Sequence, residues 1–338
     1  MHRLDGSAGG GQLLRTALSL SLVTGESFEM ANIRGNRSTP GLKAQHVACV
    51  SVAASVANAD VDGGDEGAST LQFDPGALSS DPVSVSVGTA GSATLVSETL
   101  LPVAVALDDP LTLTVTGGTD VRWSPPADYL RYVKRPLCAT FGVSFDVEVL
   151  RRGFYPAGGG RLGVRLAPAD PTPIDLLDRP PLDNVDVYSV ASESLADASV
   201  ADRQVEGVRD ALSGAGVETP IRASVTYAES ASPGTAVVLA AHCGDVVAGF
   251  DAYGERGVPA EDVGAQAVDA FADWYRSDAP VDRHMADQLL VWVAVAGGRL
   301  RIPAVTEHVR TNLDVIRAFG YDIEVRETDG GAVVECER

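Results

Sequence analysis

Several short segments of this chain combine residue types that bind phosphate groups. The first, Ser7 to Arg15, reads SAGGGQLLR, so three glycines lead into an apolar stretch of helical character. Free N–H groups and the dipole at a helix N-terminus favour an anion, and Arg15, one turn inside the helix, could reach that anion. A tight turn with a purely structural role explains the glycines equally well.

A second segment, Asn32 to His46, reads NIRGNRSTPGLKAQH and places three cations before a helix. Arginine forks match the geometry of phosphate oxygens. In so acidic a chain, the clustering of Arg34, Arg37 and Lys43 favours a phosphate-binding role over a solvated basic loop.

A third segment, residues 152–162, reads RGFYPAGGGRL. Three consecutive glycines in a strand-like context indicate the close approach of another backbone or of a ligand. The spacing alone does not choose between these two.

His308 is the histidine best placed for chemistry. It lies at the start of a helix, in TEHVRTN, where Thr306 can act as the N-cap. We expect the helix N-terminus to lower the imidazole pKa and so to keep a nucleophilic nitrogen free. A lone histidine at such a position is more often a cap or surface residue. His284 precedes Ala-Asp-Gln on an earlier helix.

The elements that carry these segments recur three times. Each repeat opens with an apolar helix and continues with a strand, a second helix and a hairpin-like pair of strands. The opening helices are expected at Gln12–Leu22, Ser92–Leu107 and Asp282–Val295, and the second helices at Pro40–Val56, Pro125–Phe141 and Thr306–Phe319.

The segment from about residue 170 to residue 280 interrupts this repeat pattern. They begin with a proline-rich linker at Pro168–Pro181 and continue with alternating strand and helix patterns, which indicate a small α/β domain. The strands are expected at Asn184–Ser189, Ile221–Tyr227, Thr235–Ala241 and Val246–Tyr253, and the helices at Ala201–Ser213 and Ala260–Arg276.

Composition limits the remaining possibilities. A chain of 338 residues with 45% hydrophobic content is globular and long enough for two or three units. Its four cysteines are scattered, which favours buried free thiols over a zinc site or a disulfide framework. No apolar run reaches 18 residues and no secretory leader is recognisable, so we expect a cytoplasmic protein without a membrane partner.

The net charge of −20 argues against a broad basic face for nucleic acid. Lysine occurs only at positions 43 and 134. We interpret the acidic residues as a solvated coat that keeps the protein soluble at high salt, as in a halophilic organism. Any contact with RNA must then be local.

Six segments in order resemble one known family. They are GGGQLLR, IRGNR with PGLKAQH, GTAGSATL, TGGTD with PPADY, ADQL and EHVRTN, and RGFYPAGGG matches the family signature. The chain resembles the RNA 3′-terminal phosphate cyclases along nearly its whole length.

The resemblance implies a mixed α/β (α+β) fold. Three repeated units, each of helices on a four-stranded sheet, would form a large catalytic domain from residues 1–174 and 275–338. A smaller α/β domain would be inserted at 175–274.

The resemblance also implies the reaction. A histidine attacks the α-phosphate of ATP and becomes adenylylated, and AMP then passes to the 3′-phosphate end of an RNA. The neighbouring 2′-OH closes a 2′,3′-cyclic phosphate and expels AMP. ATP and a divalent metal, Mg or Mn, are the implied cofactors, and the implied partner is an RNA 3′-phosphate end. The oligomeric state is left open.

Carried over to this sequence, the resemblance makes His308 the nucleophile. Arg15, Arg34, Arg37 and Gln45 match the substrate-phosphate site. The nucleotide-contact positions are Glu98, Pro126, His284, Met285, Ala286, Asp287 and Gln288. Three positions depart from the family: Ala8 stands where a metal-binding Glu is usual, Glu98 replaces Gln, and His284 replaces an aromatic residue. The metal ligands are therefore left unassigned.

Two alternatives remain beside an active cyclase. A cyclase-like RNA-processing factor without activity would share the fold but lack the nucleophilic histidine, so His308 opposes it and Ala8 favours it slightly. Enolpyruvyl transferases share the repeat architecture, but they have no need of EHVRTN or RGFYPAGGG.

Overall fold

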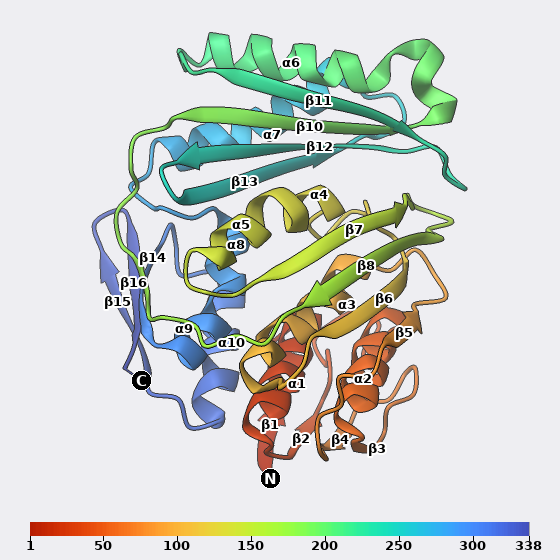
Figure 1. The fold of residues 1–338 in the computed structure, drawn as a ribbon, viewed down its shortest axis with the longest axis vertical. Coiled ribbons are helices and arrows are strands. Elements are labelled where there is room, and N and C mark those ends of the chain that lie inside the picture. Colours follow the sequence, from red (N-terminus) through yellow and green to blue (C-terminus); the bar gives the residue numbers. More distant parts are fainter. Residues whose placement is uncertain (338) are drawn as a thin grey trace.

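The computed structural model describes residues 1–337 and contains four separate four-stranded sheets (Figure 1). Three of the sheets have the same topology. In each, the first strand pairs parallel with the second, the second antiparallel with the fourth, and the fourth antiparallel with the third. The three sequence repeats are therefore β-α-β-α-β-β units.

The first unit contains two helices against its sheet. Its elements are β1 (His2–Asp5), α1 (Gly11–Thr24), β2 (Phe28–Ala31), α2 (Ala44–Ala57), β3 (Asp60–Asp62) and β4 (Leu71–Asp74). Helix α1 is buried over most of its length and ends at Gly25, whose φ of 72° is the left-handed conformation that favours glycine.

The second unit repeats this order with less regular helices. Its elements are β5 (Val83–Ser86), α3 (Ala93–Leu100), the 3₁₀ helix η1 (Leu101–Ala106), β6 (Leu111–Gly117), α4 (Ala127–Tyr129), the π-helical segment η2 (Leu130–Lys134), α5 (Arg135–Ala139), β7 (Phe145–Arg151) and β8 (Gly160–Leu166). The predicted helix Ser92–Leu107 divides where Pro102 interrupts α-helical hydrogen bonding.

The third unit is split in the sequence. Its elements are β9 (Ile174–Leu176), α8 (Arg283–Gln288), α9 (Leu290–Ala296), β14 (Gly298–Ile302), α10 (Glu307–Ala318), β15 (Ile323–Thr328) and β16 (Gly331–Cys336). The intervening chain leaves after β9 and returns at α8. It therefore occupies the connection that is a short glycine-containing loop in the other two units.

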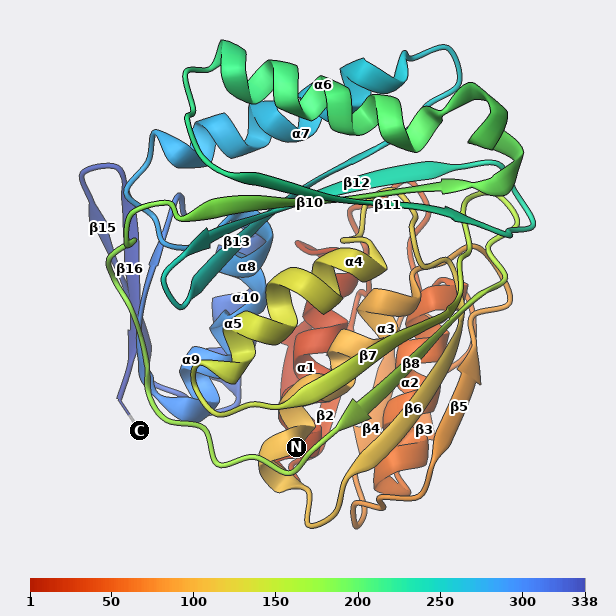
Figure 2. The same cartoon turned by 45° about the horizontal axis from the view of Figure 1, so that its top comes forward.

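The intervening chain forms the fourth sheet, in the order β11-β10-β12-β13. Its elements are β10 (Asn184–Ser192), the 3₁₀ helix η3 (Glu193–Ala198), α6 (Val200–Gly214), β11 (Ile221–Ala228), β12 (Thr235–Cys243), β13 (Val246–Tyr253) and α7 (Ala260–Tyr275). We call it the inserted sheet. Figure 2 shows α6 and α7 on one of its faces and the second unit beneath the other.

The helices of the three units face one another, and their sheets lie outside (Figures 1 and 2). A single continuous apolar core joins all four sheets. The inserted sheet contacts the second unit closely at Gly249, where an added Cβ would lie 2.4 Å from the ring of Tyr129. Only glycine allows this approach.

Arg179 links the entry and the exit of the inserted segment. Its guanidinium donates hydrogen bonds to the backbone oxygens of Trp274, Tyr275 and Ser277, and it lies 4.2 Å from the Trp274 ring. The linker before β10 is thereby fixed to the end of α7.

Two expectations from the sequence need correction. The predicted repeat lacked the first strand of every unit. The strands β1, β5 and β9 have only three or four residues each, although β5 (VSVS) does alternate between apolar and polar residues. The proline-rich linker was expected to be irregular, but it contains β9, which pairs with β14. The boundary expected at residue 175 falls within that strand, and the division into two domains stays a prediction.

Two other observations concern composition. All four cysteines are free and buried. Among residues 1–337, no helix is long and apolar enough to cross a membrane.

Candidate active site

The N-terminus of α1 is open to an anion. Its N-cap is Gly10, no side chain caps it, and its first turn holds no acidic residue. Arg15 bends back over this turn, because Nη1 would lie 3.1 Å from a Cβ added at Gly11. The first N–H groups and one guanidinium are therefore directed to the same place.

His46 covers the other side of Gly11. A Cβ added at Gly11 would lie 2.3 Å from Nε2 of His46, so the ring needs glycine at this position. The Nδ1 atom accepts a hydrogen bond of 2.9 Å from the backbone N–H of Lys43, which puts the ring proton on Nε2.

The same ring is uncharged. Burial, and then the positive charges of Arg15, Arg34 and Lys43, lower the pKa of His46 to about 3. A neutral imidazole with its proton on Nε2 is a hydrogen-bond donor, and it lies among cations that attract phosphate.

The basic loop before α2 contributes its two arginines differently. Arg34 donates to the backbone oxygens of Thr39 and Gly41, so it holds the loop in shape. Burial and the charge of Arg37 lower the pKa of Arg34. Arg37 is exposed and reaches the α1 terminus, with Nη2 3.4 Å from a Cβ added at Gly10.

Gln45 joins the first unit to the second. Its Oε1 accepts a 2.8 Å hydrogen bond from the backbone N–H of Ser92, which is the N-cap of α3. The side-chain amide N–H₂ is the part left for a substrate.

His308 lies at the N-terminus of α10, which Thr306 caps as expected. A buried hydrogen bond of 3.0 Å from Thr16 Oγ1 to Asn312 Oδ1 fixes α10 against α1. His308 is about half exposed, and its Nδ1 lies 3.3 Å from Oδ2 of Asp287. A carboxylate accepts hydrogen bonds only, so Nδ1 carries the proton and the lone pair on Nε2 is free.

The pKa of His308 is raised, so the expectation of a lowered pKa at this helix terminus is wrong. The hydrogen bond with Asp287 is the largest cause, and the negative charge of Asp287 adds to it. Burial and the charges of Arg37 and Arg15 lower the pKa, but their combined effect is smaller than that of Asp287. His308 is thus within electrostatic range of both arginines.

Asp282 holds the residues 284–288 in place. It caps α8 by accepting from the N–H groups of His284 and Met285, and it also accepts from Tyr129 Oη and the backbone N–H of Gly249. One buried carboxylate therefore joins α8, α4 and β13.

The stretch that the resemblance assigns to the nucleotide divides into two groups. Met285 and Ala286 are buried in the core. Asp287 and Gln288 are half-buried, and Asp287 Oδ1 and Gln288 Oε1 are buried atoms without a hydrogen-bond partner. Unpaired buried acceptors are costly, which fits a site that completes its hydrogen bonds with a ligand.

His284 faces the inserted sheet. Its Nε2 lies 3.5 Å from Oδ1 of Asp251, and its ring packs edge-on against Tyr129. Burial raises the pKa of Asp251 to about 6, although His284 opposes the shift.

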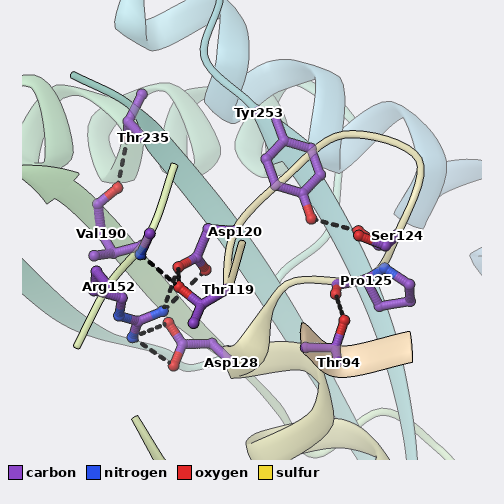
Figure 3. Close-up of polar contacts among 11 residues, drawn as sticks. Thr94, Thr119, Asp120, Ser124, Pro125, Asp128, Arg152, Val190, Thr235 and Tyr253 are labelled. Atoms are coloured by element: carbon purple, nitrogen blue, oxygen red, sulfur yellow. Dashed lines mark hydrogen bonds and ion pairs between the residues drawn. The ribbon is translucent and has the colours of Figure 1, made fainter. Parts of the chain in front are cut away.

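Glu98 and Pro126 belong to the second unit. The Glu98 side chain is buried, and its Oε1 lies 3.3 Å from Lys134 Nζ, an ion pair of opposite charge that does not have hydrogen-bond geometry. Pro126 is the N-cap residue of α4. The loop before it is fixed because Thr94 Oγ1 donates to the oxygen of Pro125 and Tyr253 Oη donates to that of Ser124 (Figure 3).

Arg152, from RGFYPAGGG, anchors the same loop. Figure 3 shows its guanidinium between the carboxylates of Asp120 and Asp128, with hydrogen bonds of 2.7 to 3.2 Å. Burial lowers the pKa of Arg152, but the two carboxylates outweigh burial and raise it above its ordinary value. Arg152 is therefore a charged structural clamp.

Two of the three glycines, Gly158 and Gly160, make room for backbone, whereas Gly159 has a φ of 66° and meets only the side chain of Arg151. A Cβ on Gly158 would lie 2.7 Å from Cα of Ala90, and one on Gly160 would lie 2.6 Å from the backbone N of Gly153. The motif thus supports the loop before α3, and that loop meets Gln45. Of the two explanations that the sequence left open, the close approach of another backbone accounts for Gly158 and Gly160.

A family model described as RNA 3′-terminal phosphate cyclase matches residues 7–325. The chain belongs to this family. It is 47% identical to the RNA 3′-terminal phosphate cyclase of Halobacterium salinarum over 346 aligned residues, which cover 99% of both chains. The identity is 40% to that of Pyrobaculum aerophilum and 37% to that of Pyrococcus furiosus, and each covers 94% of this chain and 92% of the relative.

The family implies ATP as a cofactor, and the site has features that suit a nucleoside triphosphate. The uncapped α1 terminus and the arginines match its phosphates, and the unpaired acceptors on Asp287 and Gln288 match donors on the ligand. The fit to a metal ion is poor. Residues 1–337 hold no group of three His, Cys, Asp or Glu side chains that could bind one, and Ala8 is exposed with no ligating atom.

Three residues have roles in shaping the site that sequence reasoning did not identify. Asp282 was placed only at a helix start, although an aspartate there is a typical N-cap. His46 was predicted to support the basic loop, which its hydrogen bond from Lys43 confirms, but its packing on Gly11 was not foreseen. The partners of Arg152 could not be found, because Asp120 and Asp128 lie 32 and 24 residues away.

Proposed function

We propose that this protein converts the 3′-terminal phosphate of RNA to a 2′,3′-cyclic phosphate at the expense of ATP. The observation that carries the proposal is the pair His308 and Asp287, since Asp287 holds the proton on Nδ1 and leaves Nε2 free. Arg15 and Arg37 lie close enough to His308 to influence its charge, so an anion bound by them would lie near the nucleophile.

The steps balance as three phosphoryl-group displacements. The Nε2 lone pair of His308 forms a bond to the α-phosphorus of ATP, and the bond to pyrophosphate breaks. An oxygen of the RNA 3′-phosphate then attacks the same phosphorus, and His308 leaves. Finally the 2′-OH attacks the RNA phosphorus, loses its proton, and displaces AMP.

Apart from His308, the residues of the site contribute position and charge rather than covalent chemistry. Arg15, Arg37, the amide of Gln45 and the Nε2–H of His46 are the donors proposed for the phosphates. Arg34 shapes the loop that presents Arg37. Proximity of this kind supplies much of the rate enhancement in phosphoryl transfer.

Nucleotide contacts are proposed for residues 284–288, Glu98 and Pro126. Gln288 has a free buried acceptor for the purpose. Because His284 pairs with Asp251 and Glu98 with Lys134, their contribution is proposed to be shape rather than a strong new hydrogen bond.

A divalent metal, Mg or Mn, is proposed to arrive with ATP. Mg²⁺ commonly keeps several waters and binds through substrate phosphates with few protein carboxylates. That mode suits a chain with Ala8 and no cluster of ligands. The metal ligands stay unassigned, and the cytoplasmic location stays a prediction.

The decisive experiment is labelling with α-³²P-ATP, magnesium or manganese, and molar salt. The wild-type protein should acquire an acid-labile, base-stable label and convert RNA 3′-phosphate to the cyclic form. His308→Ala should lose both activities. His242→Ala, a histidine of the inserted sheet that pairs with Asp186, is the matched control and should keep them.

Two results would contradict the proposal. Label that persists in His308→Ala would remove His308 as the nucleophile. A folded wild-type protein that never labels at any salt concentration or with either metal would favour the cyclase-like factor without activity.

A further inference from the structure

A cleft of about 450 Å³ lies between the second unit and the inserted sheet, and Arg152 is one of its lining residues. Its walls come from α4 with η2, from β7 and from β10 with β11. We call it the tyrosine cleft. It is lined by Asp128, Arg131, Tyr132, Arg151, Tyr188 and Thr226, among others. His308 is not part of it.

The cleft has a flat aromatic wall. The rings of Tyr132 and Tyr188 stack in parallel with centroids 3.7 Å apart, and Arg131 lies 5.0 Å from the Tyr132 ring. Burial and the charge of Asp186 raise the pKa of Tyr188 to about 12, so its phenol is neutral. Aromatic rings with a nearby guanidinium are a typical platform for stacked bases.

The cleft also has free positive charge. Arg152 is compensated by Asp120 and Asp128, but Arg131 and Arg151 form no ion pair with any described residue. Arg151 uses Nε to donate to the oxygen of Gly159, which leaves its terminal nitrogens available. The only uncompensated acid in the lining is Glu229, an exposed residue.

Arg131 and Arg151 lie in one cleft of a chain whose net charge is −20. The lining adds the hydroxyls of Ser224 and Thr226, which are exposed on β11. Arginine for phosphate, tyrosine for a base and hydroxyls for a ribose or a base edge are together the recognition chemistry of single-stranded RNA. The volume is within the range of small-ligand sites.

The cleft and the proposed nucleotide contact Pro126 share one helix, α4. Asp128 lines the cleft and follows Pro126 by two residues on the same helix, a rise of about 3 Å. Side chains two residues apart point to opposite sides of a helix, so a strand whose 3′ end is at His308 would pass around α4 to reach Arg131.

We propose that the tyrosine cleft binds the RNA strand a few nucleotides upstream of its 3′-phosphate. Arg131 and Arg151 contact backbone phosphates there, and the pair Tyr132 and Tyr188 stacks against a base. The inference rests on the proposed function, since it takes the RNA end to be the substrate. It makes the inserted sheet one wall of the RNA site.

The first test compares RNAs of two lengths in the double variant Arg131→Ala/Arg151→Ala. KM for a 12-nucleotide RNA 3′-phosphate should rise about tenfold or more, whereas KM for a dinucleotide 3′-phosphate and the rate of His308 labelling by ATP should not change. Removing two phosphate contacts should reduce the slope of log Kobs against log salt by about 1.4. Arg209→Ala/Arg276→Ala removes equal charge from α6 and the end of α7, on the opposite face of the inserted sheet, and should change neither quantity.

The second test separates stacking from charge. Tyr188→Leu should weaken binding of the long RNA by about fivefold to 100-fold, with an unchanged salt slope. Tyr188→Phe keeps the ring and should bind as the wild type does. A 4-thiouridine placed two to six nucleotides from the 3′ end should crosslink to Tyr132 or Tyr188.

The outcomes distinguish the two proposals. If the wild type neither labels nor cyclises, the proposed function fails. If the wild type cyclises both RNAs but the double arginine variant keeps its KM for the long one, the cleft does not bind RNA. An equal increase in KM for both RNAs in the double arginine variant would also overturn the inference, because the cleft would then serve the fold. Slower labelling by ATP would overturn it too, because the cleft would then serve the nucleotide.

Discussion

Asp287 Oδ2 lies 3.3 Å from Nδ1 of His308, and these residues come from different helices, α8 and α10. The contact fixes which nitrogen of His308 carries the proton, and it raises the pKa of the imidazole. Asp287 therefore has two roles. It orients the nucleophile His308, and the family resemblance implies that it also contacts the nucleotide.

The pair predicts a particular pH dependence of adenylylation. Protonated His308 has no lone pair, so labelling should be slow below the raised pKa and should increase as pH rises through it. Asp287→Asn removes the negative charge, so the midpoint should move to lower pH, and the maximal rate should fall by about tenfold or more because the tautomer is no longer fixed. Single-turnover labelling between pH 5 and 9 measures both.

Asp314→Asn is the matched control for that experiment. Asp314 is an exposed carboxylate on α10, the helix that carries His308, and it pairs with Arg317. Its removal changes the net charge equally and should leave the midpoint in place. A midpoint in Asp287→Asn that stays constant or moves upward contradicts the assigned contact.

Gly11→Ala should damage the phosphate site in spite of lying in a helix. The added Cβ would lie 2.3 Å from Nε2 of His46, so the ring must move and lose its bond from the N–H of Lys43. We expect a loss of about 1–3 kcal/mol in unfolding free energy and a higher KM for RNA 3′-phosphate. Urea unfolding and steady-state kinetics provide the measurements.

Gly214→Ala provides the comparison. Gly214 is the last residue of α6, and an added Cβ there meets nothing within 4 Å. This variant should be more stable by about 0.4–1 kcal/mol, because alanine restricts the unfolded chain. Equal behaviour of the two glycine variants would mean that His46 does not pack on Gly11.

Arg152→Ala should destabilise the protein strongly. It leaves Asp120 and Asp128 as uncompensated charges in a buried place, which costs about 3–5 kcal/mol. Arg203→Ala breaks a similar bidentate pair with Glu261 at the surface, where ion pairs contribute little. Thermal unfolding of the two variants at one salt concentration should therefore show a large decrease in Tm for Arg152→Ala alone.

Salt should stabilise the protein. At a net charge of −20 the folded chain repels itself, and the Debye length decreases from about 10 Å at 0.1 M to about 3 Å at 1 M. Tm should increase over this range. Neutralising the exposed segment 60–66, through Asp60→Asn, Asp62→Asn, Asp65→Asn and Glu66→Gln, should raise Tm at 0.1 M and reduce the increase. If Tm increases with salt as much in this variant as in the wild type, the repulsion among these four carboxylates does not cause the increase.

The sequence was sufficient for the repeats because their signals are local. Helices such as Gln12–Leu22 follow from periodicity, and Thr306 was identified as a cap from its type alone. The resemblance supplied the family, which the comparisons confirm.

What could not be predicted depends on contacts between distant residues. Nothing near His308 in the sequence shows Asp287, which is 21 residues away and reverses the expected direction of the pKa shift. The strands β1, β5 and β9 form because a neighbouring strand pairs with them, and three or four residues carry too little pattern to show it. The pairing of Tyr132 with Tyr188 likewise arises only when the inserted sheet packs on the second unit.

The position of the inserted segment has a consequence for how such a chain can diversify. Three units of identical strand order are the expected product of duplication within one gene, and the third copy accepted new material between β9 and α8. Arg179 holds the two ends of that material together, so the segment can be lengthened, exchanged or removed while the strand pairing of its host continues undisturbed. A duplicated scaffold can in this way keep its chemistry constant while the wall that faces the RNA evolves separately.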